Sequence, residues 1–83
     1  MIKVLYFARF RDALNCAEEK LQITDEITSV AKLASLLAER GDIWRETLNS
    51  GKVLVAINQE VADFNTEICD GDEVAFFPPV TGG

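Results

Sequence analysis

The two ends of the chain carry its most continuously apolar segments, and this pattern constrains the fold more than any other. Residues 2–7 (IKVLYF) and residues 73–77 (EVAFF) have the length and composition of β-strands. Continuous apolar runs are typical of strands covered on both faces, as the central strands of parallel sheets are. The sequence therefore predicts a sheet whose first and last strands lie side by side and parallel at its centre.

One longer helix is expected between these ends. Apolar residues over 30–38 recur at helical spacing along a single stripe. We expect Thr28 or Asp25 to cap the start of this helix and Gly41 to end it in the left-handed conformation. Two short helices are predicted over residues 10–14 and, capped by Asp42, over residues 43–48.

Three more strands and three turns complete the predicted elements. The strands are expected at 18–23, at 52–57 and around Val61. Turn signals stand at Asn49-Ser50-Gly51, Asn58-Gln59 and Asp70-Gly71.

A mixed sheet with the two end strands in the middle, crossed by one main helix with short helices beside it, is the β-grasp arrangement of the α+β class. We expect this domain over residues 1–77, followed by an extended C-terminal tail over residues 78–83. A ferredoxin-like α+β sandwich and a small open barrel are the alternatives. The ferredoxin-like layout requires two long helices, and the pattern supplies one.

Alternation along the strands separates two faces of the sheet. In the first strand Ile2, Val4 and Tyr6 form a wholly apolar set, which we expect to meet the helix. In the first, third and last strands, the opposite set begins with a charged residue and its remaining members are apolar. These apolar members predict an exposed patch on the far face of the sheet, and such a patch usually marks a protein partner. The alternative is that the segment around Trp44, or residues 60–69, covers this far face of the sheet. The patch consists of Leu5, Phe7, Leu54, Ala75 and Phe77, joined by Val61 and flanked by Arg9 and Arg11.

Composition excludes most kinds of active site. The 83 residues contain no histidine, which removes Ser-His and Cys-His catalysis and most zinc sites. Cys16 and Cys69 have no metal-like spacing and are expected to be reduced thiols without an assigned role. The net charge of −6 argues against nucleic acid and anionic membranes as partners. We expect a cytoplasmic protein with no bound metal or cofactor of its own.

The C-terminal segment FFPPVTGG leaves the last strand through two prolines and stops on two glycines. Pro78 and Pro79 have a fixed φ and no backbone N–H, so the ladder stops while the chain stays extended. Gly82 and Gly83 have no side chains and pass through a slot too narrow for other residues. The terminal α-carboxylate reacts only after activation, for example as an acyl-adenylate, and then accepts sulfur as a thiocarboxylate. We interpret the segment as a carrier arm.

Residues 70–83 (DGDEVAFFPPVTGG) closely resemble the C-terminus of the small subunit of molybdopterin synthase, the MoaD family of sulfur carriers. Residues 1–8 (MIKVLYFA) resemble the first strand of that family, and residues 51–59 resemble its third strand. The middle of the chain matches in pattern only.

The resemblance implies a ubiquitin-like β-grasp fold and two protein partners. A ubiquitin-activating-enzyme-like adenylyltransferase would use ATP to adenylate Gly83, which is then thiocarboxylated. The tail would next enter the large subunit of molybdopterin synthase and give its sulfur to cyclic pyranopterin monophosphate, forming the molybdopterin dithiolene. Family members form heterotetramers with the pterin site on the large subunit. The implied docking residues are Leu5, Phe7, Arg11, Val61, Ala75 and Phe77 on the domain and Pro78, Pro79, Val80 and Thr81 in the tail, with Gly82 and Gly83 at the reacting end.

Two other functions stay open at this point. One is a sulfur carrier of another pathway, such as thiazole synthesis, or a carrier that is conjugated to proteins; it shares the tail chemistry and differs in partner. The other is an adaptor domain whose tail does no chemistry. A β-grasp iron–sulfur ferredoxin is excluded, because two cysteines cannot hold a four-thiolate cluster.

Overall fold

The computed structural model describes residues 1–49 and 52–79 as one mixed sheet and three helices. In this part of the chain no helix is long and apolar enough to cross a membrane. The strands are β1 (Ile2–Tyr6), β2 (Glu18–Leu21), β3 (Leu54–Ile57), β4 (Glu60–Ala62) and β5 (Glu73–Phe77). The helices are α1 (Arg9–Leu14), α2 (Val30–Ala38) and α3 (Asp42–Leu48).

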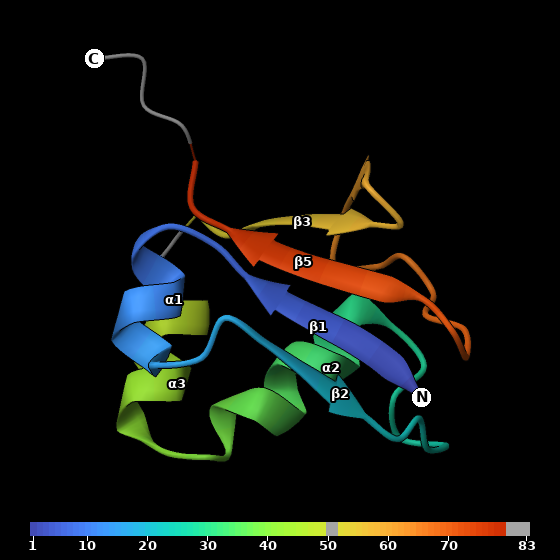
Figure 1. Ribbon diagram of the computed structural model, residues 1–83. Helices are drawn as coiled ribbons and strands as arrows, with labels where there is room; N and C mark the ends of the chain where they lie inside the picture. The colour runs from blue at the N-terminus through green and yellow to red at the C-terminus, as the bar shows by residue number, and fades with distance from the viewer. Residues whose placement is uncertain (50–51, 80–83) are drawn as a thin grey trace.

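The first and last strands are parallel neighbours at the centre of the sheet (Figure 1). The strand order is β2-β1-β5-β3-β4, with every pair antiparallel except β1 and β5. Val4 pairs with Val74 and Tyr6 with Phe76, and all four side chains are buried. This topology confirms the β-grasp prediction, and the ferredoxin-like and barrel alternatives are wrong.

The predicted apolar stripe packs α2 against the sheet. Val30, Leu33 and Leu37 are buried, as the helical spacing indicated. The capping prediction was wrong, because Ser29 is the N-cap and its side-chain oxygen accepts a hydrogen bond from the N–H of Lys32 (3.3 Å). Ser29 has the extended backbone that an N-cap needs.

Gly41 does not end α2 in the left-handed conformation. Glu39 ends the helix in a right-handed conformation, and hydrogen bonds of the chain continue in tight turns through Arg40. Gly41 stands directly before α3 with φ 152° and ψ 178°, a conformation that strains any residue with a side chain. Asp42 is the first residue of α3 and not its cap. Glycine is therefore required by the link between α2 and α3.

The predicted turns at Asn58-Gln59 and Asp70-Gly71 are both present. Asn58 and Gln59 have positive φ (52° and 70°), as two-residue hairpin turns of the I′ kind require, and they join β3 to β4. Gly71 has φ 92°, and its N–H donates to the carbonyl oxygen of Met1 (2.9 Å). The predicted turn at 49–51 includes residues 50 and 51, which lie outside the described residues.

A polar cluster joins parts of the fold that are distant in sequence. The hydroxyl of Tyr6 donates to the carboxylate of Glu19 (2.8 Å), and the guanidinium of Arg40 donates two bonds to the same carboxylate (2.7 and 2.8 Å). The Arg40 guanidinium also lies over the ring of Trp44, 4.6 Å from its centroid. The cluster thus ties β1 and β2 to the α2–α3 link and to α3.

The charges of this cluster follow from its surroundings. Burial raises the pKa of the Tyr6 hydroxyl, which keeps it a proton donor, and the Glu19 carboxylate adds to the effect. Burial alone would also raise the pKa of Glu19, but the hydrogen bonds from Arg40 and Tyr6 outweigh it and hold that pKa below its usual value. Glu19 is therefore an anion in the folded protein at neutral pH.

Replacing Glu19 by glutamine is expected to lower the free energy of unfolding at pH 7 by about 1–2 kcal/mol, because charge-assisted hydrogen bonds are lost from a partly exposed pair. The folded-state pKa of Glu19 is depressed, so its contribution is complete above the ordinary glutamate pKa of about 4.3 and is lost as the pH falls through the folded value. Urea unfolding at pH 7 and at acidic pH measures both effects.

The matched control for this experiment is Glu26→Gln at an exposed position. It should leave stability unchanged at both pH values. A difference between Glu19→Gln and the wild type that persisted at full strength in acid would contradict the charged assignment of Glu19.

Candidate functional site

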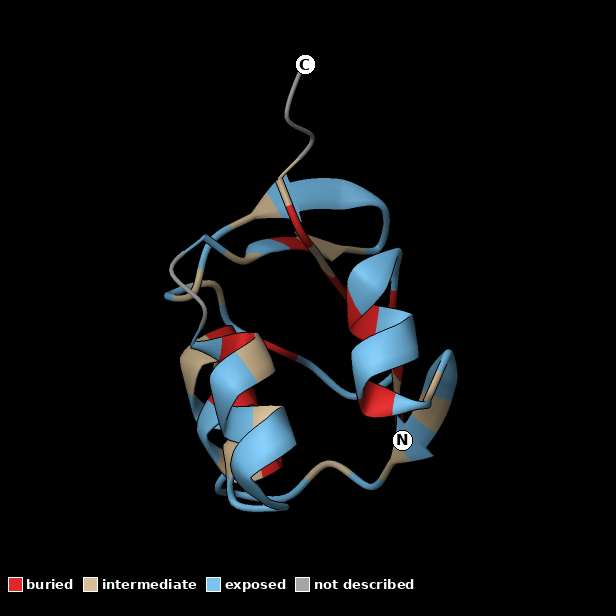
Figure 2. Ribbon diagram, turned by 90° about the vertical axis from the view of Figure 1, so that its left-hand side faces the viewer, coloured by how far each residue is buried: buried red, intermediate tan, exposed pale blue. Residues whose placement is uncertain are grey.

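The helices cover one face of the sheet and leave the opposite face open. Buried residues gather on the inward sides of the helices and along the central strands (Figure 2). Trp44 packs edge-on against the buried ring of Tyr6, on the helix side, with ring centroids 5.5 Å apart. The N–H groups of Val30 and Ala31 at the start of α2 donate to the carbonyl oxygens of Thr66 and Phe64 (3.0 and 2.9 Å). The segment around Trp44 and the loop after β4 therefore lie on the helix side and do not cover the far face.

A continuous apolar row crosses four strands of the open side. Leu5 of β1 pairs with Ala75 of β5, Ala75 pairs with Ala56 of β3, and Ala56 pairs with Val61 of β4. Val61 is 85% exposed at the edge of the sheet, whereas Ala75 is only 7% exposed at its centre. Ala75 thus forms the floor of the row, while Leu5 and Val61 provide its accessible surface.

A second row lies beside the first, toward the end of β5. Leu54 of β3 pairs with Phe77 of β5. The N–H of Phe7 donates to the carbonyl oxygen of Phe76 (3.2 Å), which extends the parallel ladder by one residue and keeps Phe7 next to β5. Phe7 is 47% exposed, Leu54 is 41% exposed and Phe77 is half-buried. We call the two rows together the open face: Leu5, Phe7, Leu54, Ala56, Val61, Ala75 and Phe77.

Charged side chains occupy the other end of the same side of the sheet. Lys3 pairs with Glu73 of β5 and with Lys20 of β2. The ammonium of Lys3 lies 3.5 Å from the carboxylate of Glu18. The apolar residues are therefore concentrated at the end where β5 finishes.

The C-terminal arm begins at this apolar end. β1 and β5 run toward the end of the sheet where α1 and α3 stand together (Figure 1). After β5, Pro78 is buried and Pro79 is half-buried, so the root of the arm is packed against the domain. Val80, Thr81, Gly82 and Gly83, to which we assign the arm's docking and chemistry, lie outside the described residues.

The remaining candidate residues differ in their surroundings. Arg9 lies with its guanidinium 5.7 Å from the centroid of the Phe10 ring, and Arg11 is exposed on α1, at the apolar end of the sheet. Cys16 and Cys69 are free thiols, one half-buried and one exposed. Burial raises the pKa of the Cys16 thiol, with Glu19 adding to the shift, and this disfavours the nucleophilic thiolate.

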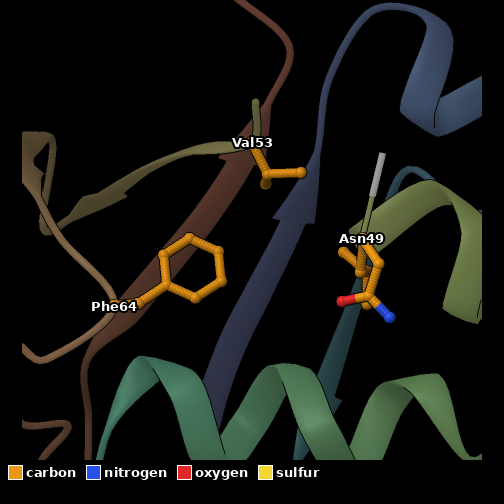
Figure 3. Close-up of a pocket in the computed structure, with 4 residues that line it drawn as sticks. Asn49, Val53 and Phe64 are labelled. Carbon is orange, nitrogen blue, oxygen red and sulfur yellow. The ribbon is translucent and has the colours of Figure 1, made fainter. Parts of the chain in front are cut away.

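A hollow of about 400 Å³ opens beside the C-terminal end of α3 and supplies no catalytic group (Figure 3). Its lining side chains carry no titratable group: Leu48, Asn49, Val53 and Phe64. Within residues 1–49 and 52–79 there is also no group of three or more side chains that would hold a metal ion. The open face with the root of the arm is therefore the candidate functional site.

The sequence matches those of known carriers over its whole length. The model of the ThiS family matches residues 4–83. The chain is 41% identical over 83 residues to the molybdopterin synthase sulfur carrier subunit of Haemophilus influenzae and 42% identical to that of Escherichia coli. In both comparisons the match covers 100% of each chain.

Solved structures agree with the fold. SAMP1 from Haloferax volcanii matches with a TM-score of 0.79 at 23% identity, over 99% of this chain and 98% of that one. A chain from the complex of subunits 1 and 2 of molybdopterin-converting factor from Helicobacter pylori matches with a TM-score of 0.67 at 23% identity, over 99% and 97%. Together with the family match over residues 4–83, these comparisons show that the chain belongs to the ThiS family of ubiquitin-like β-grasp proteins.

Proposed function

We propose that this chain is the sulfur carrier subunit of a molybdopterin synthase and that Gly83 is the residue that carries the sulfur. The observation that supports this most strongly is the end-to-end identity of 41–42% with carriers of that name. The open face adds a physical reason, because it lies at the end of the sheet where the chain leaves for the tail.

The chemistry of the arm is acyl activation followed by sulfur transfer. An oxygen of the Gly83 carboxylate attacks the α-phosphorus of ATP in the adenylyltransferase, and pyrophosphate leaves. A sulfur nucleophile at the oxidation level of hydrosulfide then attacks the acyl carbon and AMP leaves, so that one carboxylate oxygen is replaced by sulfur. In the synthase, the thiocarboxylate sulfur displaces an oxygen substituent from a carbon of cyclic pyranopterin monophosphate, and water then cleaves the resulting thioester so that the sulfur stays on the pterin. Two such transfers, from two loaded chains, supply the two sulfurs of the dithiolene. Gly83 is thereby returned as a carboxylate.

The domain contributes to this chemistry by positioning the acyl group of Gly83. An extended chain advances by at most about 3.3–3.6 Å per residue, so the four residues after Pro79 reach on the order of 13 Å. That length takes the acyl group into a partner's interior only if the partner lies against the root of the arm. Docking on the open face achieves this, because Phe77 belongs to the face and is followed directly by Pro78 and Pro79.

The large subunit of the synthase is the partner that we assign to the open face. The neighbour from Helicobacter pylori was solved as a complex of subunits 1 and 2, which supports a second subunit here. The adenylyltransferase needs the same tail tip, so the two partners bind in turn and not together. A heterotetramer with two copies of each subunit is the assembly implied by the family.

A carrier that is conjugated to other proteins is the second candidate. The likeness to SAMP1 at 23% identity supports the shared fold and does not distinguish the two functions. Recovery of the synthase large subunit with this chain, in preference to conjugated proteins, separates them.

Replacing Gly83 by alanine is expected to reduce dithiolene formation by about a hundredfold or more, because a methyl group at the tip displaces the acyl carbon within sites that fit glycine. The melting temperature should not change, since the substitution lies beyond the last strand. A reconstituted synthase assay with purified partners measures the transfer.

Deleting Gly82 and Gly83 separates a carrier from an adaptor. The truncated chain should still bind the large subunit and should form no dithiolene. Undiminished dithiolene formation by either tail variant would contradict the proposed role of Gly83.

Replacing Phe77 by aspartate is expected to weaken binding to the large subunit at least about tenfold, because it places a charge in the centre of the contact. Lys20→Ala is the matched control: it changes the net charge by the same amount at the other end of the same side of the sheet. Val61→Asp provides a variant with little risk to folding, because Val61 is 85% exposed. Calorimetric affinities equal to the wild type for both aspartate variants would remove the open face from the interface.

A further inference from the structure

Ala8, directly after Phe7, has a backbone conformation that alanine rarely adopts. Its φ is 55° and its ψ is −134°. In this region the Cβ atom crowds the backbone, and glycine is the residue that enters it freely. The other described residues with positive φ, glycines apart, are Asn15, Asn58 and Gln59. Asparagine tolerates positive φ, and Gln59 lies in a hairpin turn, whereas Ala8 has no polar side chain to offset the strain.

The surroundings of Ala8 hold it in this conformation. On one side, the N–H of Phe7 donates to the carbonyl oxygen of Phe76 (3.2 Å), which fixes the end of β1. On the other side, the ring of Phe10 is buried in the core, and the backbone N–H of Phe10 donates to the carbonyl oxygen of Phe7 (3.1 Å). The chain must therefore pass from the sheet ladder into the core within three residues. Strain of this kind persists where neighbours over-determine the backbone, and it is found preferentially at functional positions.

The residue that this turn holds in place is Phe7. Phe7 is the most exposed aromatic residue of the open face and lies beside β5 at the root of the arm. With alanine at position 8, the backbone that follows Phe7 has fewer accessible conformations than it would have with glycine. Because the backbone is already restricted, the Phe7 ring loses less conformational freedom when a partner docks.

We propose that Ala8 is a positioning residue, which keeps the Phe7 ring arranged for docking in return for a less stable fold. The inference rests on the proposed function, because it requires that a partner binds the open face. It attributes two effects to the strain at Ala8: the domain becomes less stable, and its affinity for the large subunit becomes higher.

The test replaces Ala8 by glycine. Relief of the strain should raise the melting temperature by roughly 4 °C, as expected for a domain of this size. Affinity for the synthase large subunit should fall by about three- to tenfold, because Phe7 is no longer preorganised. In the synthase reaction the KM for the sulfur-loaded chain should rise while kcat stays unchanged, since the tail itself is not altered. Ala13→Gly, at an exposed position of α1, is the control: it should lower the melting temperature and leave affinity unchanged.

A double-mutant cycle with Phe7→Ala shows whether Ala8 acts through Phe7. In the Phe7→Ala background, Ala8→Gly should still raise the melting temperature but should no longer change the affinity. A melting temperature of Ala8→Gly at or below the wild-type value, or an unchanged affinity, would overturn the inference and leave the proposed function intact. A wild-type chain that bound neither partner would overturn both.

Discussion

The parallel pairing of β1 with β5 is the interaction on which the rest of the structure depends. It buries Val4, Tyr6, Val74 and Phe76 in the centre of the domain. Because the pairing is parallel, both strands deliver their next residues to the same end of the sheet. Phe7 and Phe77 therefore reach the open face together, and the arm leaves beside them. An antiparallel pairing would place these two residues at opposite ends and would separate the open face from the arm.

The open face also exposes the protein to unwanted association in water. An apolar surface across four strands invites association with other chains. Three features of the chain oppose this: the net charge of −6, the charged residues at the far end of the same face, and the charged residues Glu18, Glu19 and Lys20 of the edge strand β2. Apolar contact is thus confined to the end of the sheet near the arm. A partner that binds there also finds the arm.

Residue spacing was enough to predict the parts of the fold that depend on one strand or one helix. Alternation assigned Tyr6 to the buried side and Phe7 to the open side, and the helical stripe predicted the buried face of α2. The cap at Ser29 was missed because the choice among neighbouring polar residues depends on a bridge to Glu67, far away in sequence. The ion pair of Glu19 with Arg40 and the strain at Ala8 gave no local signal, since both arise from packing between distant segments. The docking role of the predicted residues stays a prediction, and what the structure adds is that Ala75 and Pro78 are buried, which required the three-dimensional arrangement.

Intact-mass and fragment-mass analysis of the chain is the measurement that tests the carrier role most directly. The chain would be incubated with ATP, the adenylyltransferase and a sulfur source, and then analysed with and without a thiol reductant. The carrier role predicts the exchange of one oxygen for one sulfur, located at Gly83 and resistant to the reductant. An unchanged Gly83, or sulfur found only at Cys16 or Cys69 and removed by the reductant, would contradict it.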